Sequence, residues 1–176
     1  LFLKEMEKRG MVKIKRISGC SIGSLVGFLF MIDKLDIIFD LYKPVCNTLK
    51  SNHNLELITQ LDIILKDHIP DNICQQVNKR LFISYYHLSK RKKYTKSVYT
   101  DKSEIVKAII RSCFIPYLIN GKLVYENKYI DGLNPYIFKS IKGRKILYLE
   151  LFGMDKIQNI FNIKNEKTNI HRALSG

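Results

Sequence analysis

A turn built around Gly19-x-Ser21-x-Gly23 is the sequence feature that most restricts what this chain can fold into. In a nucleophile elbow, which has this spacing, a strand turns sharply into a helix and leaves the serine exposed at the bend. The serine adopts a strained backbone conformation, and side chains two residues to either side would collide across the turn. The spacing therefore makes Ser21 a candidate nucleophile at a strand-to-helix junction.

The residues on both sides of this turn fit a strand and a helix. Val12, Ile14 and Ile17 supply an apolar, β-branched approach to the turn. Residues 24–32 then run without a charge or a proline, as a buried helix would. The alternative is a glycine-rich turn whose serine merely caps the helix.

Length and composition indicate one globular domain with an excess of positive charge. The chain has 176 residues, of which 46% are hydrophobic, and its 30 Lys and Arg against 16 Asp and Glu give a net charge of +14. That charge favours an anionic partner, which could be a phospholipid surface, a nucleic acid or an acidic protein. The cysteines are scattered without a C-x-x-C pair, which argues against structural zinc and indicates reduced thiols.

Hydrophobic periodicity predicts several helices. The first begins the chain and ends at Gly10, another follows Asp33 and ends at Pro44, and a third covers residues 55–65. Residues 46–54 are expected to form a loop, and residues 71–80 a short helix. Asp101-x-x-Glu104 resembles a capping box for a helix that ends near residues 112–116.

Strand patterns occupy the second half of the chain. Residues 81–88 are aromatic and β-branched, and they predict a strand that turns at 89–92 and returns over 93–100. Asn120-Gly121 predicts a hairpin that joins residues 117–119 to 122–125. The apolar run 146–151 suits a central strand.

A carboxylate follows a further short predicted strand, at Asp131-Gly132. Such a position can hold an acid at the rim of a sheet, although an ordinary Asp-Gly turn is the alternative. A serine hydroxyl needs a base to remove its proton, and a carboxylate within about 2.6–3.2 Å could do so. The Ile22 amide, directly after Ser21, is a natural donor to the oxyanion that forms.

The order of these motifs resembles the patatin-like phospholipases over most of residues 1–151. The resemblance is carried by the elbow, the hairpin, Ser112-Cys113-Phe114-Ile115-Pro116, Asn120-Gly121 and Tyr129-Ile130-Asp131-Gly132. It implies a three-layer α/β/α sandwich with a central, mostly parallel sheet. It also implies that Ser21 is the nucleophile and that Asp131 activates it as a two-residue dyad without histidine. The motif residues around the dyad are Gly19, Ile22, Gly23 and Gly132.

The chain departs from the family pattern in two places. Leu133 stands where the family usually has glycine or alanine after Asp-Gly. The family also carries a glycine-rich oxyanion loop before the helix with which this chain begins. We therefore expect residues 1–176 to be a single patatin-like domain and a fragment without that N-terminal strand and loop. Losing one oxyanion donor typically costs about 10²–10³ in rate, so the fragment is expected to be slow or inactive.

A rival triad would use Ser21, Asp131 and His171, in the chain order of α/β-hydrolases. His171 lies in a polar tail, and no pattern places it beside the elbow, so the dyad is preferred. No histidine or carboxylate cluster has the spacing of metal ligands, and we expect neither a metal nor another cofactor.

The motifs together predict a lipid acyl hydrolase that cleaves ester bonds of phospholipids or related acyl lipids through an acyl-Ser21 intermediate. The alternative is a catalytically inactive lipid-surface or protein-binding module with the same fold. The positive charge fits adsorption to an anionic membrane, so we expect a cytoplasmic protein that is peripheral at membranes. Residues 90–93 form either a solvated hairpin tip or a contact with that surface, and nucleic-acid binding rests on charge alone.

Overall fold

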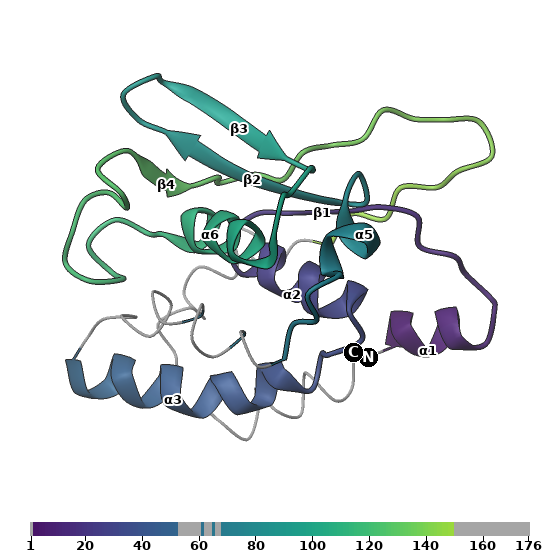
Figure 1. Cartoon of the computed structure of the whole chain (residues 1–176), viewed down its shortest axis with the longest axis horizontal. Helices are drawn as coiled ribbons and strands as arrows, with labels where there is room; N and C mark the ends of the chain where they lie inside the picture. The colour runs from purple at the N-terminus through teal and green to yellow at the C-terminus, as the bar shows by residue number, and fades with distance from the viewer. Residues whose placement is uncertain (1, 53–60, 62–64, 66–67, 150–176) are drawn as a thin grey trace. The chain divides into compact units, whose positions relative to one another are not determined.

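The computed structural model describes residues 2–52, 61, 65 and 68–149 (Figure 1). The chain divides into two compact units, one formed by residues 1–13 and 138–176 and the other by residues 14–137. The single domain expected over residues 1–176 stays a prediction.

The first unit contains helix α1, Phe2–Lys8, which is followed by Gly10 in the left-handed region (φ 70°). Helix and glycine lie where the sequence predicts them. The apolar run 146–149, in contrast, forms no strand, and its side chains are exposed. The predicted central strand is therefore wrong over these described residues, because an apolar run becomes a strand only where a partner strand supplies its hydrogen bonds.

The second unit is organised around a four-stranded sheet with β2, Leu81–His87, at its centre. The three other strands all pair with β2: β1, Ile17–Gly19, runs parallel to it, while β3, Lys92–Lys96, and β4, Tyr129–Asp131, run antiparallel (Figure 1). The fold is thus of the mixed α/β class, and this sheet is mixed rather than mostly parallel. The three-layer sandwich stays a prediction.

The register of β2 brings two strand ends together. Gly19, the last residue of β1, pairs with Ile83, whereas Asp131, the last residue of β4, pairs with Tyr85. Because β3 pairs with residues 83–87 along one edge of β2, β1 and β4 must share the other edge. The two strands therefore approach Ser84 from opposite ends of that edge.

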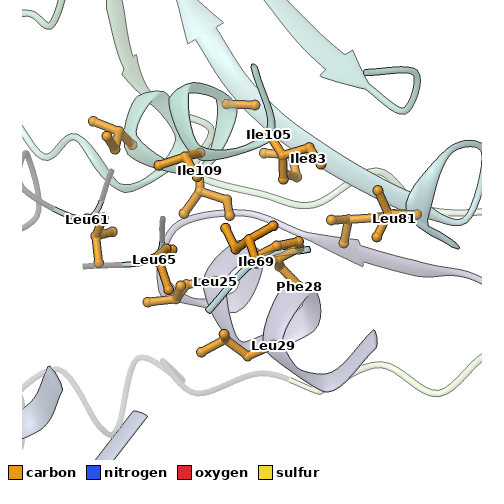
Figure 2. Packing of buried hydrophobic residues seen from close by; sticks show 14 of the residues in the cluster. Leu25, Phe28, Leu29, Leu61, Leu65, Ile69, Leu81, Ile83, Ile105 and Ile109 are labelled. Carbon is orange, nitrogen blue, oxygen red and sulfur yellow. The ribbon is translucent and has the colours of Figure 1, made fainter. Parts of the chain in front are cut away.

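Two helices, α2 (Ile22–Met31) and α6 (Lys102–Cys113), pack against the sheet. Figure 2 shows how apolar side chains of α2, β2 and α6 interlock in the core, and Phe28, Ile83 and Ile109 are fully buried. The capping prediction is confirmed at the start of α6, where the Asp101 carboxylate accepts a hydrogen bond from the Glu104 amide at 2.8 Å.

The predicted end of a helix at Pro44 and the loop predicted after it are both wrong. Helix α3 spans Ile37–Asn52 with Pro44 inside it, because proline removes only one backbone donor and a helix can continue past it. The loop expected over residues 46–54 is therefore helical as far as Asn52. The helix expected over residues 55–65 lies almost entirely outside the described residues. Helix α5, Ile73–Val77, confirms the short helix expected over 71–80.

The hairpin predicted at Asn120-Gly121 does not form. Gly121 has a φ of 72°, and its amide donates to the Tyr117 carbonyl at 3.1 Å, so the dipeptide makes a turn. Residues 117–119 and 122–125 nevertheless form no strands, although Tyr125 makes an isolated antiparallel bridge to Tyr129. Among the described residues, no helix is long and apolar enough to cross a membrane.

Candidate functional site

Ser21 lies at the bend between β1 and α2, as the elbow spacing predicts. Its backbone is in a left-handed, strained conformation with φ 52° and ψ −141°. It occupies the N-cap position of α2, but its side chain makes no capping hydrogen bond. The alternative in which this serine merely caps the helix therefore finds no support.

The two glycines of the elbow differ. A Cβ atom on Gly19 would lie 2.5 Å from the Gly23 carbonyl oxygen, so only glycine fits where the strand meets the first turn of the helix. A Cβ atom on Gly23 would meet nothing within 4 Å, and its φ is not positive. The expectation that side chains on both sides would collide is thus right for Gly19 and wrong for Gly23.

Ser24 fixes the first turn of the helix beneath the elbow. Its hydroxyl and its amide both donate to the Ser21 carbonyl, at 2.7 and 2.9 Å. Ser24 is fully buried, so these hydrogen bonds do not compete with solvent. They hold the Ser21 backbone from its carbonyl side.

Asp131 ends β4 and is 8% exposed. Burial raises the pKa of its carboxyl group, while hydrogen bonds from the Ser21 side chain and from the Leu133 amide lower that pKa. The bond from the Leu133 amide to Oδ1 measures 2.7 Å. The structure thus brings together the two residues predicted as nucleophile and base, and the base lies in a desolvated environment.

Gly132 follows Asp131 in a position that excludes any side chain. A Cβ atom there would lie 2.6 Å from the carbonyl carbon of Ser84 and 3.0 Å from the Tyr85 nitrogen. The chain leaving β4 therefore passes directly over the backbone of β2. The glycine after the aspartate is a packing requirement here, which goes beyond the ordinary Asp-Gly turn.

The end of α6 contributes residues to the site for which the sequence indicates no role. Ser112 accepts a hydrogen bond from the Ser21 amide, and Phe114 accepts one from the Asp131 amide. Both acceptors lie at the C-terminal end of a helix, where carbonyl groups have no intrahelical partner. A single sequence carries no signal for such contacts, because they join separate elements of the chain, 91 positions apart in the case of Ser21 and Ser112.

Two thiols near the site are kept in the protonated form. Burial raises the pKa of Cys20, and the charge of Asp131 raises it further. Burial also raises the pKa of Cys113 to about 12. A thiol reacts as its thiolate, so neither cysteine competes with Ser21 as the nucleophile near neutral pH.

Two exposed apolar residues stand close in sequence to Ser21 and Asp131. Ile22 is 41% exposed and begins α2, so its amide belongs to the helix end whose N–H groups lack intrahelical acceptors. Leu133, two residues after Asp131, is 77% exposed. Both side chains are apolar and lie within two positions of Ser21 or Asp131 in the chain.

Other predicted elements of the site can be located only in part. His171 lies outside the described residues, so the triad is neither supported nor excluded by the geometry. The described residues contain no group of three or more His, Cys, Asp or Glu side chains that could hold a metal ion. A second oxyanion donor, expected from a loop before the first helix, stays a prediction.

The chain is similar to one curated protein, the mouse 1-acylglycerol-3-phosphate O-acyltransferase Pnpla3 (Mus musculus). The two are 28% identical over 126 residues, which cover 65% of this chain and 30% of the mouse protein. This similarity suggests the patatin-like family. No protein-family model matches the chain. No solved structure matches it.

Proposed function

We propose that this chain is the core of a patatin-like serine hydrolase that transfers acyl groups from lipid esters through Ser21. The observation that supports the proposal is the strained backbone of Ser21 together with the buried Asp131 carboxyl group, whose pKa the Ser21 side chain lowers. Strained serines at strand-to-helix bends present their hydroxyl to a substrate, and a desolvated carboxylate is a stronger base than a solvated one.

The chemistry follows from these two groups. The Ser21 oxygen attacks the ester carbonyl carbon as its proton passes to the Asp131 carboxylate, and a tetrahedral oxyanion forms. The Ile22 amide is the candidate donor to that oxyanion. Collapse expels the alcohol, which takes the proton from Asp131 and leaves an acyl-Ser21 ester. Water then attacks that ester as its proton passes to Asp131, and collapse releases the fatty acid as the departing Ser21 oxygen takes that proton back from Asp131.

The substrate class is supported by the exposed apolar side chains of Ile22 and Leu133 beside the dyad. It is also supported by the name of the mouse relative, which describes acyl transfer to 1-acylglycerol-3-phosphate. Attack on acyl-Ser21 by a lipid hydroxyl in place of water would make the protein an acyltransferase. Hydrolysis of phospholipids or related acyl lipids is the reaction that we propose first.

We further propose that an anionic membrane surface holds the protein near its substrate. Residues 90–93, Lys-Arg-Lys-Lys, are exposed at the tip of the β2–β3 hairpin, and the Lys93 ammonium donates to the Pro135 carbonyl at 3.4 Å. The tip thus lies next to the segment that follows Asp131. Vesicles containing phosphatidylserine should bind the protein, neutral vesicles should bind it weakly, and added salt should release it. Stronger binding to nucleic acid than to these vesicles would contradict the proposal.

Covalent labelling by a fluorophosphonate tests the enzymatic proposal directly. We expect the reagent to modify Ser21, as located by mass spectrometry, and labelling to be lost in Ser21→Ala. Ser18→Ala is the matched control, because it removes a nearby serine hydroxyl that has no hydrogen-bond partner among the described residues. A folded protein that does not react at Ser21 would contradict the proposal and favour the inactive lipid-surface or protein-binding module.

A further inference from the structure

The Ser112 hydroxyl connects the elbow to the central strand. It donates to the Ser84 carbonyl at 2.7 Å and accepts from the Ser21 amide at 2.9 Å. The Ser112 carbonyl also accepts from the Ser21 amide, at 3.1 Å, so that one N–H is shared by two oxygens of the same residue. Ser112 is fully buried, and no solvent competes for these bonds.

The next residues of the same segment hold the other half of the site. Cys113 lies beside the Ser24 hydroxyl, with 3.9 Å between sulfur and oxygen, and that hydroxyl donates to the Ser21 carbonyl. The Phe114 carbonyl accepts from the Asp131 amide at 2.9 Å. Residues 112–114 therefore contact the amides of Ser21 and Asp131 directly, and they reach the Ser21 carbonyl through the Ser24 hydroxyl.

The Ser84 carbonyl is where these contacts converge. It accepts the Ser112 hydroxyl, and Gly132 packs so closely on it that a side chain would overlap it. Ser84 lies between the β2 residues that pair with the last residues of β1 and β4. A displacement of Ser112 would therefore be transmitted to the elbow and to the aspartate turn together.

We infer that residues 112–114 form a positioning brace that sets the separation between the Ser21 hydroxyl and the Asp131 carboxylate, with the Ser112 hydroxyl as its key side chain. Ser112 does not touch the reacting atoms; it acts through the Ser21 backbone. Its catalytic consequence rests on the proposed function. The strained φ of Ser21 is held by the shared N–H, and losing one of its two acceptors lets the backbone relax away from the carboxylate.

Ser112→Ala tests the brace through the kinetics of fluorophosphonate labelling. We expect the maximal rate of inactivation to fall about 10–100-fold, as misplacement of a reacting group by about 1 Å does, while the concentration for half-maximal rate stays unchanged. Hydrogen exchange of the Ser21 amide, measured by NMR, should become faster. Ser112→Cys, which keeps a weak donor and acceptor of similar size, should give an intermediate rate.

Ser18→Ala should leave both the labelling rate and the exchange of the Ser21 amide unchanged. Unchanged labelling and exchange in a folded Ser112→Ala protein would overturn the inference and leave the proposed function intact. If the parent protein is not labelled at Ser21, the proposed function fails, and amide exchange still decides whether the brace exists. If Ser112→Ala does not fold, Ser112→Cys must show the reduced rate, and a rate equal to the parent would overturn the inference.

Discussion

The elbow at Ser21 and the turn after Asp131 are two solutions to the same backbone problem. Each turn follows a short strand on the same edge of β2, and each contains a glycine at which a Cβ atom would overlap neighbouring backbone. Each also has a residue with positive φ, which is Ser21 in the elbow and Leu133 in the aspartate turn. In both turns, a backbone amide donates to the end of α6.

The two turns differ in which residue carries the strain. At the elbow, the strained residue is Ser21 itself, the proposed nucleophile. Helix α2 follows directly, and the hydrogen bonds from Ser24 to the Ser21 carbonyl hold the Ser21 backbone in place. At the aspartate turn, the strain falls on Leu133, whose amide bonds to the Asp131 carboxylate. The elbow thus presents its side chain, whereas the aspartate turn immobilises its side chain. This difference agrees with the roles proposed for Ser21 as nucleophile and Asp131 as base.

The largest effect should come from removing the charge at the aspartate turn. Asp131→Asn keeps an oxygen for the Leu133 amide but cannot accept the serine proton, so we expect the rate of ester hydrolysis to fall about 10³–10⁴-fold. Steady-state hydrolysis of a short-chain ester measures this. Asp101→Asn is the control, because that carboxylate accepts a helix-capping bond remote from the site.

His171→Ala should leave the same rate nearly unchanged. A loss from the histidine substitution as large as that from Asp131→Asn would replace the dyad with a triad.

An intermediate effect should separate the two glycines of the elbow. Gly19→Ala places a methyl group 2.5 Å from a backbone oxygen, and the free energy of unfolding should fall by about 1–3 kcal/mol or more. In Gly23→Ala the new methyl group lies in open space on α2. This substitution should raise the free energy of unfolding by about 0.5–1 kcal/mol, because alanine favours the helix. Urea denaturation measures both. Equal destabilisation by the two substitutions would show that the helix start is packed more tightly than this geometry allows.

The smallest effect is the pH dependence that Asp131 gives to the free energy of unfolding. Burial raises the pKa of Asp131, so the folded state disfavours the carboxylate relative to the unfolded chain. The protonated carboxyl group therefore contributes fully to the free energy of unfolding below the ordinary pKa of aspartate. This contribution is lost as the pH rises through the folded-state pKa. Asp131→Asn should therefore be more stable than the parent at pH 7, by less than the change in Gly19→Ala. That advantage should disappear in acid. If the stability advantage of Asp131→Asn did not vary with pH, burial would not be what raises the pKa of Asp131.

Local patterns predicted the parts of the site that depend on neighbours in sequence. The elbow, the capping bond of Asp101 and the strand before Asp131 involve residues within four positions of one another, where steric and hydrogen-bonding rules act directly. The same kind of reasoning failed at Asn120-Gly121, where the turn forms but the strands do not. A turn signal fixes the direction of the chain, whereas strands need partners that the local sequence does not specify.

The sequence by itself determined that a serine with flanking glycines stands between a strand and a helix, and that an aspartate with a glycine behind it ends another strand. Only the tertiary structure decided that these two places meet. Their meeting depends on β2, which pairs with both strands on one edge. It also depends on the end of α6, where carbonyl groups without an intrahelical partner accept hydrogen bonds from the amides of Ser21 and Asp131. Strand register and helix-end contacts of this kind join residues from separate elements, up to 91 positions apart for Ser21 and Ser112, and burial raises the pKa of the Asp131 carboxyl group.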